Sequence, residues 1–190
     1  MPFYNPLPEV LCERDIVFWR NETQQLQLDM YRAPSVTRYR GKAPVLLVVH
    51  GGGWVLGFKQ YQGLRLMRML ASRGWIVLNI DYRLSPRATF PEHIKDVKRA
   101  IVWVREHISS YGGDATQLYL SGNSAGAHLA SLAALSPLAP EFQPEFPHVD
   151  TRIQGCVLWY GVYDLLDRQQ HFTNQGCQQL LEKHVFKVKR

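Results

Sequence analysis

Apolar and polar residues alternate along the chain in a way that predicts strands separated by helices. Residues 15–19 and 25–30 read as two antiparallel edge strands, the second with an apolar residue at every second position. Residues 45–49 and 75–80 are nearly continuous apolar runs, a pattern typical of parallel strands that helices cover on both faces. The pattern therefore favours a mostly parallel sheet with antiparallel strands at its edge.

Four helices are expected between and after these strands. Residues 64–71 carry apolar side chains at helical spacing, and Gly74 is well placed to end that helix. The longest helix follows Pro91, a residue suited to the first helical position. Its apolar stripe steps by three and four residues through Ile94, Val97, Ile101, Val104 and Ile108. A small-residue helix at 127–135 would approach the sheet closely, and an amphipathic helix is predicted at 177–185.

Two further strands complete the predicted pattern. Residues 118–120 are expected to form a short strand and residues 153–160 a buried one. Strands that alternate with helices in this way build a parallel α/β sheet with right-handed crossovers. Since no internal repeat or linker interrupts the chain, residues 1–190 are expected to form one domain. Edge strands or a cap-like segment would occupy 1–40, and the core would occupy 43–165.

Composition narrows the class of protein without indicating an activity. The chain is 46% apolar and 20% charged, which is ordinary for a soluble globular domain, and no apolar run approaches the ~18 residues of a membrane-spanning helix. The N-terminus lacks the features of a secretion signal, so we expect a cytoplasmic protein. The net charge of +6 is dispersed, which argues against a nucleic-acid partner. Three widely spaced cysteines predict neither a disulfide framework nor a metal site.

A G-x-S-x-G sequence at 122–126 carries the first candidate chemistry. Ser124 stands between a predicted strand and a predicted helix, where Gly122 and Gly126 let the backbone take strained dihedral angles. Such a turn would hold the Ser124 hydroxyl clear of the sheet, at its carboxyl edge and near a helix N-terminus. We therefore interpret Ser124 as a candidate nucleophile. A glycine-rich turn with an incidental serine is the alternative.

A second glycine-rich sequence, H-G-G-G-W at 50–54, directly follows the apolar run at 45–49. Three successive glycines leave backbone N–H groups unobstructed, which suits the stabilisation of an oxyanion in a tetrahedral intermediate. A phosphate-binding loop is the competing interpretation, but the sequence lacks both the G-K-[ST] ending and the G-x-G-x-x-G spacing. The joint presence of this loop and the Ser124 turn is the most specific signal in the chain.

Together with the sequence D-Y-R-L-S-P at 81–86, these two motifs resemble the hormone-sensitive-lipase-like branch of the α/β-hydrolase superfamily. The resemblance covers residues 45–164 and agrees in the order and approximate spacing of the motifs. It implies an α/β-hydrolase fold with a mostly parallel sheet and helices on both faces. It also implies that the chain hydrolyses carboxylic esters with a serine nucleophile and without a cofactor.

The resemblance also implies a role for individual residues. Ser124 would be the nucleophile. The oxyanion hole would comprise Gly51, Gly52, Gly53 and Ala125, with Gly51 completing the loop and the other three donating backbone N–H groups. His50 would stabilise the loop, and Asp81 and Arg83 would support a strand end. His128 lies four residues after Ser124 on the same predicted helix, so we expect it to be structural, because a general base must approach from a separate loop.

The acid and the histidine that such a serine requires are not evident. In the family they follow the serine in that order, on loops beyond the strand predicted at 153–160. Only 27 residues follow Tyr163, whereas one strand–helix–strand unit takes about 30, so we expect the last strands of the fold to be missing from a truncated chain. A local triad is the alternative, with Asp164 as the substitute acid, Asp167 second, and His171 or His184 downstream.

Three functions follow from these interpretations. The first is a carboxylic ester hydrolase, an esterase or lipase, that acts on small acyl esters. The second is an inactive hydrolase remnant that binds a ligand or partner. The third is an arylformamidase-like amide hydrolase, because H-G-G-x-W loops also occur in kynurenine-formamidase-like members of the superfamily. A sheet without its last strands would also expose an unpaired edge, which predicts self-association.

Overall fold

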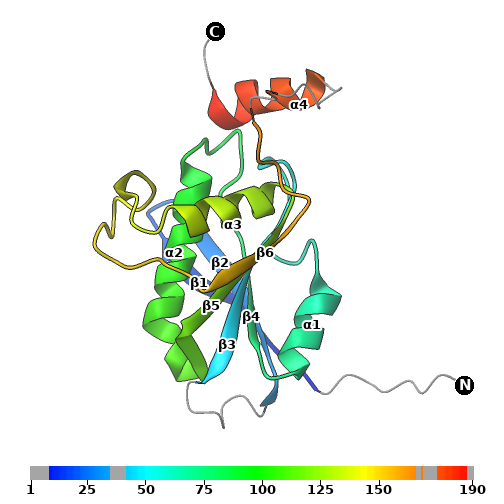
Figure 1. The fold of residues 1–190 in the computed structure, drawn as a ribbon, viewed down its shortest axis with the longest axis vertical. Helices are drawn as coiled ribbons and strands as arrows, with labels where there is room; N and C mark the ends of the chain where they lie inside the picture. The colour runs from blue at the N-terminus through cyan, green and yellow to red at the C-terminus, as the bar shows by residue number, and fades with distance from the viewer. Residues whose placement is uncertain (1–8, 35–41, 166–167, 169–174, 188–190) are drawn as a thin grey trace, which may run out of the picture.

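The computed structural model describes residues 9–34, 42–165, 168 and 175–187. Its strands are β1 (Leu11–Arg20), β2 (Gln25–Arg32), β3 (Ala43–Val49), β4 (Ile76–Ile80), β5 (Gly113–Asn123) and β6 (Gly155–Trp159). They form one sheet in the order β1-β2-β4-β3-β5-β6 (Figure 1). β2 pairs antiparallel with both β1 and β4, whereas β3, β4, β5 and β6 run parallel. The predicted mostly parallel sheet is confirmed.

Helices cover both faces of this sheet, as the apolar runs predict. α1 (Leu64–Ser72) packs on one face, and α2 (Glu92–His107) and α3 (Ala125–Leu135) cover the other (Figure 1). Successive strand residues point to opposite faces, so Leu46 clusters with Met67 of α1, while Leu47 lies in the larger core that includes α2 and α3. Parallel strands with both faces covered have no solvent-facing side, which is why β3 is apolar throughout and Asn79 is the one polar residue of β4.

The predicted helix signals are confirmed. The stripe from Ile94 to Ile108 is fully buried along α2 and the short 3-10 turn that follows it. Gly74 has a φ of +92° just after α1, and its N–H donates to the carbonyl oxygen of Ala71 at 3.1 Å. At the other end of the described chain, α4 (Gln175–Leu180) continues into a π-helical segment at Leu181–Phe186. Local capping and periodicity therefore identified all four helices.

For two strands, the predicted position in the sheet or the predicted burial was wrong. β1 lies at the edge of the sheet, but β2 is an inner strand between β1 and β4. β6 was expected to be buried, yet Val157 and Trp159 are 55% and 48% exposed. An apolar run predicts a strand, but the neighbours that cover it are distant in sequence. In addition, β5 has 11 residues and begins at Gly113, because its pairing with β3 starts where Ala43 meets Gly113.

The carboxyl ends of the parallel strands meet at one edge of the sheet and gather the candidate residues there. In the register of β3, Val49 pairs with Ile80 of β4 and with Gly122 of β5. The loops after these three strands therefore begin side by side. α4 lies above this edge (Figure 1), and Val185, just beyond α4, accepts a hydrogen bond from the N–H of Phe90 at 2.9 Å. No helix in the described part of the chain is long and apolar enough to cross a membrane.

Candidate active site

Ser124 occupies a strained turn between β5 and α3. Its φ of 52° and ψ of −117° lie in a region that residues with a side chain rarely adopt. Two hydrogen bonds hold the turn: the Ser124 N–H donates to the carbonyl oxygen of Trp159 at 2.9 Å, and the His128 N–H donates to that of Ser124 at 3.1 Å. The strand, the sharp turn and the helix are therefore arranged as the G-x-S-x-G sequence predicts.

The two flanking glycines are required by packing. A Cβ on Gly122 would overlap the backbone of Gly126, and a Cβ on Gly126 would overlap the carbonyl oxygen of Val49. Gly122 thus lets the first turn of α3 fold back on β5, and Gly126 lets the same turn press against the end of β3. Close approach of backbone to backbone explains the spacing of this motif.

The glycine loop after β3 lies against this serine turn. A Cβ on Gly51 would stand 3.4 Å from the Cβ of Ser124 and 2.7 Å from the carbonyl oxygen of Asn123. Gly52 and Gly53 have φ angles of 122° and 59°, and a Cβ on Gly52 would overlap the carbonyl oxygen of Leu56. Glycine is therefore needed at 51 for the close approach and at 52 for the shape of the loop.

Hydrogen bonding separates the three loop glycines into two kinds. The Gly51 N–H donates to Oε1 of Gln62 at 3.1 Å, so it is occupied and Gly51 serves to shape the loop. Within the described ranges, no protein acceptor engages the N–H groups of Gly52, Gly53 or Ala125. These three are the donors that the predicted oxyanion hole needs.

His50 contacts both the glycine loop and Tyr82. Its ring stacks on Tyr82 with centroids 4.3 Å apart, and its Nδ1 donates to the carbonyl oxygen of Gly51 at 2.6 Å. The Tyr82 hydroxyl donates in turn to the carbonyl oxygen of His50 at 3.0 Å. Burial lowers the pKa of His50, so the neutral ring is favoured at this position. These contacts agree with the loop-stabilising role that was expected for His50.

Comparison with known proteins shows the family to which the chain belongs. A protein-family model described as BD-FAE matches residues 28–189. The chain belongs to the BD-FAE family. Among curated proteins, the probable carboxylic ester hydrolase LipM of Mycobacterium tuberculosis is 50% identical over 163 residues, which are 86% of this chain and 37% of LipM. A probable isoprenylcysteine alpha-carbonyl methylesterase of rice, ICME, is 35% identical over 164 residues, 86% of this chain and 38% of that protein.

Solved structures show the same fold. A fungal esterase from Rhizomucor miehei covers 96% of this chain with a TM-score of 0.70 and 29% identity, and the match takes in 57% of that esterase. Esterase B from Lactobacillus rhamnosis covers 94% with a TM-score of 0.75 and 26% identity, and the match takes in 58% of its chain. This BD-FAE chain has an α/β-hydrolase fold. It spans just over a third of the length of LipM and ICME.

The D-Y-R-L-S-P segment of this BD-FAE chain, which follows β4, is held by hydrogen bonds and ion pairs to neighbouring segments. Asp81 Oδ1 accepts a hydrogen bond from the Lys59 N–H at 2.7 Å, which ties the end of β4 to the glycine-containing loop. Arg83 forms ion pairs with Asp96 at 2.8 Å and Glu92 at 2.6 Å, which anchor the segment to α2. Both residues hold backbone in place, as expected.

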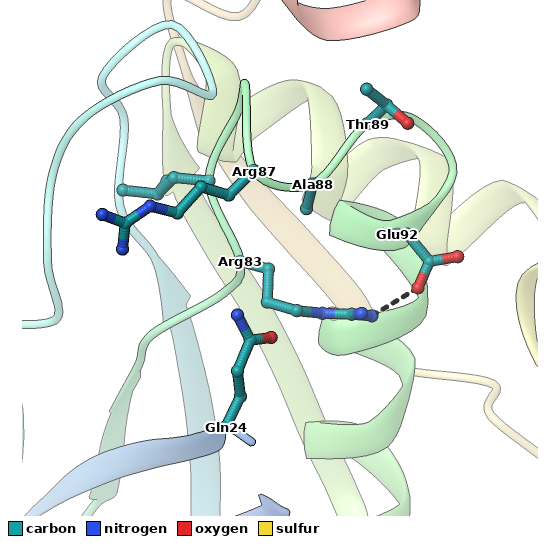
Figure 2. Close-up of a pocket in the computed structure, with 7 residues that line it drawn as sticks. Gln24, Arg83, Arg87, Ala88, Thr89 and Glu92 are labelled. Carbon is teal, nitrogen blue, oxygen red and sulfur yellow. Dashed lines mark hydrogen bonds and ion pairs between the residues drawn. The ribbon is translucent and has the colours of Figure 1, made fainter. Parts of the chain in front are cut away.

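A cavity of about 370 Å³ lies beside Arg83, away from the serine turn. Figure 2 shows Arg83 reaching across it toward Glu92, with Gln24, the residue before β2, beneath and Arg87 extending to the opposite side. Leu84, Ala88 and Thr89 complete its lining. None of the predicted site residues lines this cavity, so it does not belong to the site around Ser124.

Three histidines outside the glycine loop pack against other side chains. His128 packs edge-on against Trp54 at 5.3 Å, and burial lowers the pKa of His128. His93 is buried with its Nε2 3.1 Å from Ser85 Oγ, His107 stacks on Trp103, and His184 is exposed. Over the described residues, no side chain is hydrogen-bonded to Ser124 Oγ, and no group of three or more His, Cys, Asp or Glu residues could hold a metal ion.

The candidate acids lie after β6. Asp164 accepts a hydrogen bond from the Arg168 N–H at 2.8 Å through Oδ2, so one of its carboxylate oxygens closes a local turn. Asp167 and His171, the other local candidates, lie outside the described residues. The structure therefore brings Gly51 of the glycine loop against the Ser124–Ala125 turn, with Gly52 and Gly53 following in the same loop, and it places Asp164 beyond the strand next to the serine turn.

Sequence reasoning missed one residue of this site. Gln62 Oε1 accepts hydrogen bonds from the Gly51 N–H at 3.1 Å and from Asn123 Nδ2 at 3.2 Å. It therefore joins the glycine loop to the residue before Ser124. No local pattern distinguishes a glutamine with such a role from any other polar loop residue, because both of its partners come from other segments of the chain.

Proposed function

We propose that this chain carries the nucleophile and the oxyanion hole of a serine carboxylic ester hydrolase. The observation that supports it best is the close approach of the strained Ser124 turn and the glycine loop, where a Cβ on Gly51 would lie only 3.4 Å from the Ser124 Cβ. The names of the relatives support the same activity, since LipM is called a probable carboxylic ester hydrolase and LipQ and LipC are called esterases. Small acyl esters are the proposed substrates.

In the proposed reaction, Ser124 Oγ attacks the carbonyl carbon of the ester and gives its proton to a general base. The carbonyl oxygen gains the negative charge and accepts hydrogen bonds from the N–H groups of Ala125, Gly52 and Gly53. The Ala125 donor also lies at the N-terminus of α3, whose dipole favours negative charge. Collapse of this intermediate expels the alcohol, which takes up a proton, and leaves an acyl ester on Ser124. Water then attacks that ester and releases the carboxylic acid.

Asp164 is the proposed acid that would orient a histidine in this reaction. It follows β6, the strand that pairs with β5, and Trp159 at the end of β6 accepts the hydrogen bond from the Ser124 N–H. Its hydrogen bond to Arg168 engages one of two carboxylate oxygens, so the other can accept a histidine N–H. Replacing Asp164 with Asn should then slow acylation of Ser124.

A fluorophosphonate probe tests the proposed nucleophile directly, because it reacts covalently with an activated serine. The wild-type chain should be labelled and Ser124→Ala should not. Ser131→Ala is the matched control, since it removes a hydroxyl from the same helix that bonds only to the carbonyl oxygen of His128 in the described structure. Labelling that persists in Ser124→Ala would overturn Ser124 as the nucleophile. Absence of labelling in the wild type would overturn the proposal and favour an inactive protein that binds a ligand.

The bond that is cleaved can be tested separately. Aryl esters with acyl chains from acetate to octanoate should be hydrolysed, and Ser124→Ala should lose this turnover. N-formylkynurenine serves as the comparison substrate because its scissile bond is an amide. Turnover of the formamide without any turnover of the esters would reject the ester hydrolase and favour the amide hydrolase.

A further inference from the structure

One amide oxygen joins the two halves of the candidate site. Gln62 Oε1 lies 3.1 Å from the Gly51 nitrogen and 3.2 Å from Asn123 Nδ2. The chemistry fixes the orientation of both side-chain amides. The backbone N–H of Gly51 can only donate, so Gln62 must present its oxygen there. Asn123 must then present its NH₂ group to the same oxygen.

These three residues surround the point where the glycine loop meets the serine turn. Asn123 directly precedes Ser124, and Gly51 directly precedes Gly52, the first of the proposed loop donors. A Cβ on Gly51 would lie 2.7 Å from the carbonyl oxygen of Asn123, so the two backbones are in direct contact. Gln62 therefore connects the residue before the nucleophile to the residue before the proposed loop donors.

Gln62 is itself fixed by α1. Gly63, the next residue, is the N-cap of that helix and has a φ of +78°, and its carbonyl oxygen accepts a hydrogen bond from the Met67 N–H at 3.0 Å. Met67 and Ala71 are 1% and 0% exposed in the core against the sheet. The bridging oxygen thus belongs to a loop residue that directly precedes the N-cap of a packed helix, so this helix limits how far Gln62 can move.

We propose that Gln62 is a positioning residue that sets the distance between Ser124 and the N–H groups of Gly52 and Gly53. The proposal rests on the proposed ester hydrolase activity. An oxyanion hole works only when its donors lie about 2.7–3.1 Å from the developing charge, and displacement by about 1 Å can cost about 100-fold in rate. By accepting hydrogen bonds from both Gly51 and Asn123, one acceptor next to a packed helix would keep the N–H donors and the nucleophile at a fixed separation.

Three variants separate this role from a general contribution to the fold. Gln62→Met keeps the length of the side chain and removes the acceptor. Gln62→Glu keeps an acceptor at the same place, which can bond to both partners. Gln60→Met is the matched control, because Gln60 lies two residues earlier in the same loop and its Nε2 donates to Asp29 Oδ2 at 2.5 Å, in a contact that does not involve Gly51.

The first measurement is the rate constant for labelling of Ser124 by the fluorophosphonate probe. Gln62→Met should react about 10- to 100-fold more slowly than the wild type, and Gln60→Met should react at close to the wild-type rate. Thermal unfolding of the two variants should shift by similar amounts, since each loses one side chain's hydrogen bonding. If Gln62→Met is slowed no more than Gln60→Met, the positioning role is wrong.

The second measurement needs no reaction and reads the bridge itself. Exchange of the Gly51 amide hydrogen, followed by NMR on ¹⁵N-labelled protein, should be about 10-fold faster or more in Gln62→Met and close to the wild-type rate in Gln62→Glu and Gln60→Met. An unchanged Gly51 exchange rate in Gln62→Met would overturn the bridge. Failure of the wild-type protein to react with the probe would instead overturn the proposed function, so the two failures are distinct.

Discussion

Gly126 of α3 lies so close to Val49 of β3 that a Cβ on Gly126 would overlap the Val49 carbonyl oxygen. The first turn of the helix is therefore seated directly on the end of the central strand. We predict that Gly126→Ala unfolds the protein or lowers its free energy of unfolding by about 3 kcal/mol or more, because the clash is between backbone and Cβ and no rotamer can relieve it. Thermal and urea unfolding would measure the loss.

The control for this prediction is a glycine with room for a side chain. Gly155 of β6 has a φ outside the left-handed region, and the nearest atom to a Cβ there belongs to the Tyr119 ring at 3.7 Å, an ordinary van der Waals distance. Gly155→Ala should therefore change stability by less than about 1 kcal/mol. If both alanine variants behave alike, the close seating of α3 on β3 is not what requires glycine in the motif.

The strained backbone of Ser124 makes a second prediction. A non-glycine residue at φ 52° and ψ −117° costs about 1–3 kcal/mol, whereas glycine adopts such angles freely but loses about 0.5–1 kcal/mol of chain entropy. Ser124→Gly should therefore be more stable than Ser124→Ala by roughly 1 kcal/mol. Urea unfolding would measure the free energy of unfolding of both variants. Since neither carries the serine hydroxyl, its loss does not contribute to the difference. Equal stability, or a less stable glycine variant, would show that the turn stores no strain.

His93 should make stability depend on pH. Ser85 Oγ donates to the Ala88 carbonyl oxygen, so His93 Nε2–H donates to Ser85 Oγ, and a second proton would sit on the buried Nδ1, which has no acceptor among the described residues. Burial, with a smaller effect of the Arg83 charge, lowers the pKa of His93 to about 4. As the pH falls from 6.5 to 4, the unfolded chain therefore takes up this proton first, and stability is lost over that window.

The variant His93→Gln isolates this contribution, because its Nε2 can donate to Ser85 and it does not titrate. Between pH 7 and pH 4.5 the wild type should lose roughly 2–3 kcal/mol more of its free energy of unfolding than the variant. Carboxylates titrate in both proteins and cancel in the comparison. Urea unfolding at the two pH values gives the four numbers required. If the free energy of unfolding falls equally in the two proteins, protonation of His93 does not destabilise the fold.

The exposed edge at β6 predicts self-association. Among the described strands, β6 pairs with β5 alone, and Val157 and Trp159 are half-exposed on it. An unpaired apolar edge is a template for another strand, so the protein should form oligomers as its concentration rises. Sedimentation velocity over a concentration series would detect them. Val157→Lys should shift the population toward monomer, because a charge at an edge opposes pairing.

Leu135→Lys is the control for the edge variant. Leu135 is the most exposed large apolar residue of the described chain, and it lies at the end of α3 rather than on β6. Loss of oligomers in both variants would indicate general hydrophobic association, and a wild type that stays monomeric throughout would refute pairing at the edge.

Local sequence signals predicted most of the elements and the main parts of the site. Each of these signals is contained in a short stretch of sequence. Helical periodicity marks the apolar stripe of α2, and the backbone freedom of glycine marks the end of α1 and the two glycine motifs. Ser124 and the glycine loop could be assigned for this reason. The same reasoning failed for β2 and β6, because an apolar strand does not state which strands or helices will be its neighbours.

The sequence alone thus determined the order of strands and helices, the turn at Ser124 and the presence of a loop rich in unobstructed N–H groups. Only the tertiary structure decided that Gly51 donates its N–H to Gln62, while the N–H groups of Gly52, Gly53 and Ala125 have no protein acceptor among the described residues. It also decided that Val157 and Trp159 of β6 are half-exposed. Both outcomes depend on contacts between segments far apart in the chain. Local composition and hydrophobic periodicity do not show which of these segments will contact each other.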